Sequence, residues 1–146
     1  MKSPMKLIKG AAMVEFALLL PVLMLMVLGI VHFGLFIYDQ AVITNAAREG
    51  ARWGAIHTTA STTADCSSSV KPGDISNPDP CLIANNYAYK NVISLFSDPV
   101  VTTESFGTGG AGSLVTVTVN FAYTGLGYAN LFKSENLHAT SVMYHE

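Results

Sequence analysis

One uninterrupted apolar run near the N-terminus constrains this chain more than any other feature. Residues 16–38 contain no aspartate, glutamate, lysine or arginine, so the run is 23 residues long. As a helix that rises roughly 1.5 Å per residue it would measure roughly 35 Å, enough to cross the ~30 Å hydrocarbon core of a bilayer. We therefore expect a transmembrane helix over 16–38, followed by one small domain in the rest of the 146 residues.

The charges on either side of this run predict the orientation of the chain. Three lysines precede the run, with no acidic residue before Glu15. Beyond the run Asp39 comes first, and the nearest basic residues are Arg48 and Arg52. By the positive-inside rule, residues 1–10 lie in the cytoplasm and the C-terminal domain lies outside. The formal net charge of −2 gives no reason to expect a nucleic-acid partner.

The helical pattern continues beyond the membrane segment. Residues 40–56 contain no proline, and Ala46, Gly50 and Gly54 repeat every four positions along one face. Each glycine in a solvated helix is unfavourable by ~1 kcal/mol relative to alanine, so close packing would explain these residues. Two interpretations stay open: the stripe packs against a helix of another subunit, or against the C-terminal domain of its own chain.

A polar segment at residues 58–81 separates this helix from the rest of the chain. It is rich in serine, threonine, aspartate, proline and glycine, which is typical of a long surface loop. It contains both cysteines, Cys66 and Cys81, and a pair in an oxidising compartment outside the cytoplasm predicts a disulfide. Free thiols and a metal site are the alternatives, and the lack of a nearby histidine argues against the metal.

The C-terminal region predicts one more helix and three strands. Apolar residues recur on one helical stripe of residues 82–96. Apolar and polar residues alternate most clearly in 114–123, the second of the strands predicted at 100–106, 114–123 and 137–144. We expect an α+β fold, in which the long N-terminal helix is joined to a small domain of a short helix and a three-stranded antiparallel sheet.

The segment ahead of the apolar run carries the most specific signal. Residues 1–10 are basic and end in Gly10, and Glu15 and Phe16 follow after four small or apolar residues. A carboxylate in a membrane helix is unfavourable, by on the order of 2.5–3.5 kcal/mol at the bilayer centre and less at its edge, so we expect it to have a partner. Cleavage after Gly10 would create an amine on Ala11, one helical turn from Glu15 or beside the Glu15 of a neighbouring subunit.

This pattern resembles the class III signal of type IV pilin-like proteins, which a prepilin peptidase cuts after the glycine. The version here, GAAMVEFALLLPVL, is similar to the TadE family of the tight-adherence (Tad) pilus machinery. The later segment NAAREGARWGA and the ending LHATSVMYHE also resemble that family. Trp53 is bulky for its place in the pattern, and the loop between Cys66 and Cys81 aligns with no motif of the family.

The resemblance implies a structural minor pilin or pseudopilin that acts in pilus assembly or adhesion and is not an enzyme. It implies a pilin-like fold with a cleaved leader at 1–10, a long helix at 11–57 that includes the transmembrane part 16–38, and an extracytoplasmic α+β domain at 58–146. Processing would fall between Gly10 and Ala11, with Glu15 and Phe16 acting in recognition and assembly.

The resemblance also implies where the protein lies and what it contacts. It would cross the bacterial inner membrane once, with its N-terminus in the cytoplasm, and could enter a pilus. Its partners would be membrane lipid, the prepilin peptidase, other pilin or pseudopilin subunits and the Tad assembly platform. We expect no cofactor and no metal.

Other functions stay open on the residues alone. A bitopic membrane protein with an extracytoplasmic ligand-binding domain would keep its leader, and a major filament subunit is disfavoured because Tad major pilins are much shorter. An enzyme is the third class, because Ser68 and Lys71 have the Ser-x-x-Lys spacing of penicillin-binding proteins, although the companion motifs are missing.

Two further groups of residues could carry chemistry in principle. The three histidines that follow the apolar run show no spacing that favours a catalytic triad; they are His57, His138 and His145. Oxygen ligands for calcium could come from Asp65, Asp74, Asn77 and Asp79, but these residues lack the spacing of an EF-hand. We interpret them as solvated acidic and amide groups of a loop.

Overall fold

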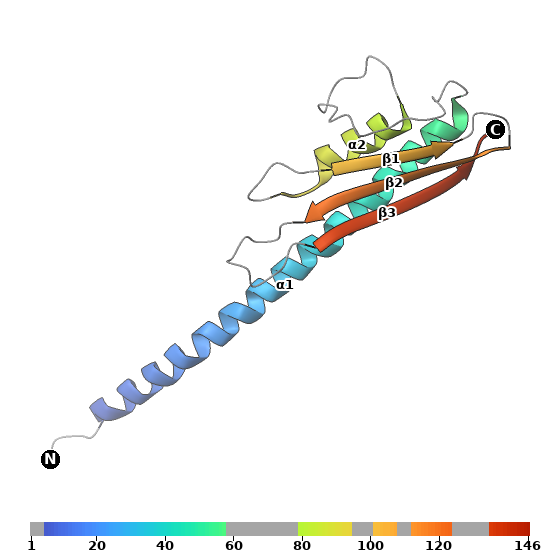
Figure 1. The fold of residues 1–146 in the computed structure, drawn as a ribbon. Coiled ribbons are helices and arrows are strands. Elements are labelled where there is room, and N and C mark those ends of the chain that lie inside the picture. Colours follow the sequence, from blue (N-terminus) through green and yellow to red (C-terminus); the bar gives the residue numbers. More distant parts are fainter. Residues whose placement is uncertain (1–4, 58–78, 95–100, 108–111, 124–134) are drawn as a thin grey trace. The chain divides into compact units, whose positions relative to one another are not determined.

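The structure, a computed structural model, describes residues 5–57, 79–94, 101–107, 112–123 and 135–146, with the backbone alone at 5–9 and 101–107 (Figure 1). The elements in chain order are α1 (Met5–Ile56), α2 (Pro80–Asn91), β1 (Val101–Gly107), β2 (Leu114–Tyr123) and β3 (Glu135–Tyr144). The chain divides into two compact units, residues 1–34 and 35–146. The first contains the N-terminal part of α1, and the second contains the remainder of α1 with α2 and the sheet.

The strands form an antiparallel sheet in the order β1-β2-β3. Leu114 pairs with Tyr144 and Phe121 with Leu137 between β2 and β3, while Val101 pairs with Phe121 between β1 and β2. The α+β class expected from the sequence is confirmed. In β2 the odd-numbered residues from Val115 to Tyr123 are all buried, as the alternation of apolar and polar residues predicts.

The core of the second unit lies between the sheet and the two helices. It is built mainly from small residues of the helices and from branched or aromatic residues of β2, with Leu137 and Ala139 from β3. The helical members are Ile43, Ala46, Ala47, Ala51, Ala84 and Ala88. Because most of these are alanines, the helix backbones can lie close to each other and to the sheet.

Hydrogen bonds among the described residues join α1 to β3 and to the C-terminal residue that follows it. The side-chain amide of Gln40 donates to the carbonyl of His138 at 3.2 Å, and the backbone amide of Glu146 donates to the carbonyl of Ala55 at 3.2 Å. The earlier residue of α1, Gln40, bonds to the earlier residue of the C-terminal segment, His138, and the later residue, Ala55, bonds to Glu146. The strand β3 therefore runs in the same direction as this part of α1, as Figure 1 also shows.

The bounds of α2 differ from the predicted 82–96. The helix begins earlier, at Pro80, because Asp79 is its N-cap and accepts a hydrogen bond from the amide of Cys81 at 3.3 Å. Asp79 is therefore a half-exposed helix cap, a role that our interpretation of it as a solvated loop acid did not include. The helix ends at Asn91, where Val92 turns to an extended conformation and the next amide, of Ile93, donates to Asp39.

A bulge ends the β2–β3 ladder. Gly112 has a φ of 85°, and its amide donates to the carbonyl of His145 at 2.9 Å. The amide of His145 in turn donates to the carbonyl of Ser113 at 2.8 Å, so Gly112 and Ser113 together oppose one residue of the other strand. The left-handed backbone conformation required at the first bulge position explains a glycine there.

Candidate assembly site

The helix of the N-terminal unit is apolar on every side over residues 16–31. Its large hydrophobic residues between Met13 and Ile30 are exposed at nearly every position, including Phe16 at 67%. Of the described residues, one helix is long and apolar enough to cross a membrane, with a mean hydropathy of 2.6 in its most apolar window. A helix without a polar face is suited to lipid or to contact with other apolar helices.

The predicted processing junction lies inside α1, which begins at Met5. Gly10 is exposed, and a β-carbon added there would meet no atom within 4 Å. Packing within this chain therefore does not require glycine at position 10. Cleavage between Gly10 and Ala11 stays a prediction.

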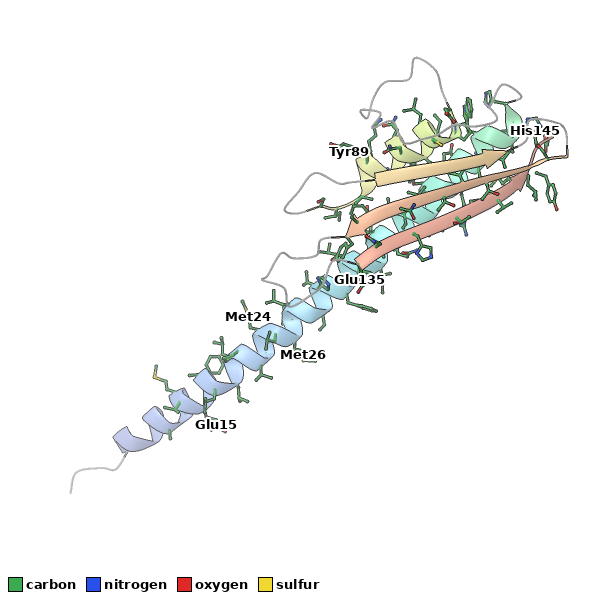
Figure 2. The ribbon with its side chains drawn as sticks, in the orientation of Figure 1. Glu15, Met24, Met26, Tyr89, Glu135 and His145 are labelled. Carbon is green, nitrogen blue, oxygen red and sulfur yellow. The ribbon has the colours of Figure 1, made fainter. Side chains whose placement is uncertain are left out.

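Glu15 is the acidic residue of this apolar unit and lies on its exposed surface, as Figure 2 shows. It follows Ala11 by four positions, so the two residues share a face of α1. Phe16 is the next residue and is also exposed. Their roles in recognition and assembly stay predictions, and they remain available for contact with another molecule.

The small-residue stripe of α1 packs inside the chain. A β-carbon added at Gly50 would lie 2.6 Å from the carbonyl oxygen of Pro80 and 2.9 Å from the β-carbon of Ala84. One added at Gly54 would lie 2.8 Å from Val115. Together with the fully buried Ala46, these glycines bring α1 against α2 and β2 of its own domain. This is the second of the two interpretations that the spacing allowed.

The opposite face of the same part of α1 is polar. Its exposed residues include Asn45, Arg48, Glu49 and Arg52. The helix therefore changes along its length, from apolar on all sides over residues 16–31 to amphipathic in the second unit. A neighbouring subunit that approached α1 here would meet charged and amide side chains.

Sequence reasoning missed the burial of Asp39. Its side chain is 0% exposed, and its Oδ1 accepts a hydrogen bond from the amide of Ile93 at 2.9 Å. Burial raises the pKa of the Asp39 carboxyl, and the hydrogen bond from Ile93 lowers it to a smaller extent. A signal was present, because Asp39 precedes Ile43, Ala46 and Gly50 at helical spacing and so belongs to the face that packs on the domain.

The predicted disulfide falls partly outside the described residues. Cys81 is 4% exposed near the start of α2, and Cys66 lies in a segment that the structure does not describe. The bond between them stays a prediction. The segment also contains the Ser-x-x-Lys pair, Ser68 and Lys71, so this pair lies outside the described residues. The same is true of three residues that could have supplied oxygen ligands for calcium, Asp65, Asp74 and Asn77.

The histidines are distributed over separate places. The ring of His57 stacks on Trp53 with a centroid distance of 4.1 Å, whereas His138 and His145 lie seven residues apart in or just after β3. His138 is exposed and His145 is buried, as expected for opposite faces of a strand. Within the described ranges no group of three or more histidine, cysteine or acidic residues could hold a metal ion.

The comparison with protein families concerns most of α1. The family model described as TadE-like protein matches residues 10–52. No curated protein and no solved structure shows significant similarity to the chain. The match starts at Gly10, continues past the boundary between the two units at residues 34 and 35, and includes Glu15 and Gly50. The resemblance to the TadE-like family is thereby confirmed, and residues 10–52 of this chain are a TadE-like segment.

Proposed function

We propose that this chain is a structural minor pilin or pseudopilin of a Tad-type pilus, is anchored in the bacterial inner membrane by α1, and has no catalytic role. The observation that carries the proposal is the two-part character of α1. One continuous helix, Met5–Ile56, is apolar on all sides over residues 16–31 of the first unit and forms part of the core of the second unit. The TadE-like segment covers both parts.

This arrangement assigns different tasks to the two parts of the helix. The small-residue stripe is already occupied by α2 and β2 of the same domain. We therefore expect apolar contacts between the helices of different subunits to be made by the first unit, where the large apolar side chains are exposed. In a membrane this surface contacts lipid, and in a pilus it would contact the equivalent helices of other subunits.

Glu15 would set the register of such a helix assembly. Apolar helices can slide along each other with little change in energy, whereas a charge pair has a defined position. The amine of Ala11, created by cleavage after Gly10, is a positive group at the required distance along the helix. We propose that Glu15 pairs with this amine in its own or a neighbouring subunit, and that Phe16 packs beside it.

The prepilin peptidase is the enzyme that we propose to create this amine. A β-carbon added at position 10 would meet no atom of the described residues within 4 Å, so the fold leaves room for a larger residue there. The glycine is then explained by the needs of a peptidase that cuts after it. Other pilus subunits and the Tad assembly platform are the proposed partners after processing, with the domain outside the cytoplasm.

The mature N-terminus tests this proposal against the rival function. In cells that contain the peptidase, mass spectrometry of the membrane fraction should find a chain that begins at Ala11. The variant Gly10→Leu should remain uncut, and Gly34→Leu, which changes another contact-free glycine of α1, should be processed normally. A native chain that begins at Met1 would support a bitopic membrane protein with a ligand-binding domain instead.

A further inference from the structure

A buried acid lies in α1 just beyond the apolar segment, and the proposed function makes no use of it. Asp39 is fully buried, and its Oδ1 accepts the hydrogen bond from the amide of Ile93 at 2.9 Å. Its second oxygen, Oδ2, is also buried and has no hydrogen-bond partner among the described residues. The Asp39 carboxyl thus joins the chain just after α2 to α1 through one of its two oxygens, while the other oxygen makes no hydrogen bond to the described residues.

We propose that Asp39 is a proton-responsive latch, which holds the chain after α2 against α1 when its carboxyl is neutral and releases it more readily when the carboxyl is ionised. The latch lies in the second turn of the unit that begins at Leu35. It would therefore control how firmly the domain holds α1 at the end nearest the apolar segment.

The surroundings of the carboxyl favour its neutral form. Phe36 precedes Asp39 by three positions on the same helix face, and its ring meets that of Tyr123 edge to face at a centroid distance of 5.6 Å. Tyr123 comes from β2 and Ile93 follows α2, so three elements meet here. An ionised carboxylate that is fully buried, with one oxygen that makes no hydrogen bond among the described residues, is unfavourable.

Tyr123 is the titratable group that acts on Asp39 from the sheet. Burial raises the pKa of Tyr123, and the negative charge of Asp39 raises it further. A phenol with a raised pKa stays neutral throughout the range in which a carboxyl titrates, so it supplies no compensating charge. On α1 the adjacent Gln40 is uncharged, and from the segment after α2 the contact is the backbone amide of Ile93.

The direction of the pKa change fixes the sign of the effect. Desolvation, the larger cause, raises the pKa of Asp39 above its ordinary value of 3.8, and the bond from Ile93 offsets part of this. When the latch is open the carboxyl is hydrated and regains its ordinary pKa. The closed state therefore binds the proton more tightly, so its advantage is complete below 3.8 and is lost as the pH rises through the raised pKa.

Amide hydrogen exchange of Ile93 in the full-length chain in detergent micelles tests the latch. Protection factors would be measured by NMR from about pH 4 to about pH 8, with the intrinsic pH dependence of exchange removed. In the wild type we expect protection to fall by up to about tenfold per pH unit within the titration window. Asp39→Asn keeps an oxygen acceptor for Ile93 and cannot ionise, so its protection should be constant and exceed that of the wild type at high pH.

Glu49→Gln provides the matched control, because Glu49 is an exposed carboxyl on the same helix. This variant should keep the wild-type profile. A wild-type profile without pH dependence, or an Asp39→Asn variant with the same decline, would overturn the latch.

If Asp39→Asn does not fold, carbon-13 titration of the Asp39 carboxyl in the wild type decides the question. A midpoint above 3.8 that coincides with the loss of Ile93 protection supports the proposal. A midpoint at or below 3.8 refutes it.

Discussion

The carbonyl oxygen of Pro80 lies so close to Gly50 that a β-carbon added to this glycine would be 2.6 Å from it. The contact joins the first residue of α2 to the middle of the packed part of α1, and Ala84 and Val117 close the same space from two other sides. The oxygen belongs to the backbone, so it cannot move aside as a flexible side chain would. Glycine at position 50 thus sets the distance between the two helices.

We expect Gly50→Ala to destabilise the domain, although alanine is the better helix former. The propensity gain is ~1 kcal/mol, and forcing an extra carbon into a packed core is unfavourable by typically about 1–3 kcal/mol, with the shortest contacts at the upper end. Thermal unfolding in detergent micelles, followed by circular dichroism, should show a lower midpoint than in the wild type. Gly34→Ala is the matched control, because a β-carbon there meets nothing within 4 Å and should leave the midpoint unchanged or raise it. Equal midpoints for the two variants would contradict this account of the contact.

The cap of α2 gives a second prediction. Asp79 accepts the hydrogen bond from the amide of Cys81, so Asp79→Ala should lower the free energy of unfolding by about 1 kcal/mol. Asp79→Asn should retain most of this stability, because asparagine is an equally good N-cap. Chemical denaturation of the three proteins measures the differences. Loss of stability in the asparagine variant as large as that in the alanine variant would show that the charge matters and the cap does not.

Cys81 leads to a third prediction. It is buried near the start of α2, and none of the cysteines that the structure describes is free. A bond to Cys66 would close a loop of about 16 residues and stabilise the fold by roughly 3 kcal/mol in the chain-entropy model. We expect a mobility shift on non-reducing gels that disappears in Cys66→Ser and in Cys81→Ser. Two thiols that react freely with an alkylating reagent in protein from the intact envelope would exclude the bond and weaken the assigned orientation.

Sequence patterns predicted the elements that are determined by their own residues and by those next to them. The alternation in residues 114–123 identified β2 with its exact ends, because one face of that strand is buried along its whole length. The start of α2 was also readable, since Asp79 followed by Pro80 is an N-cap followed by a proline in the first turn. We missed it because both residues adjoin a loop-like composition.

Features that depend on contacts between residues far apart in the sequence could not be predicted from such patterns. The segment after α2 leaves the helix at Val92, and the next amide is bound by Asp39, which lies 54 residues earlier. The spacing of Ala46, Gly50 and Gly54 gave the correct face of α1 but could not say what covers it, since own and foreign helices require the same small residues. The burial of Asp39 likewise depends on β2 and on the chain after α2, which a helical pattern does not contain.

The last prediction concerns the charge in the apolar unit. Glu15→Ala should leave insertion into the membrane unchanged, because several apolar residues at about −0.3 to −0.6 kcal/mol each near the helix centre outweigh one carboxylate near its edge. Glu15→Gln should insert equally well. Fractionation of cells and the mass of the mature chain would establish that both variants reach the membrane and lose residues 1–10.

The same variants should fail at the next step. Both remove the one acidic group of the exposed apolar surface, and with it the partner proposed for the amine of Ala11. If the amine is then buried alone between subunits, the assembly loses about 3–5 kcal/mol per contact, as for other buried pairs that lose one partner. We therefore expect a stable, cleaved, membrane-embedded protein that does not support pilus formation, measured as the yield of sheared pili beside the wild type. Normal piliation by Glu15→Ala would defeat the pairing, whereas loss of piliation with an uncut leader would assign Glu15 to recognition by the peptidase.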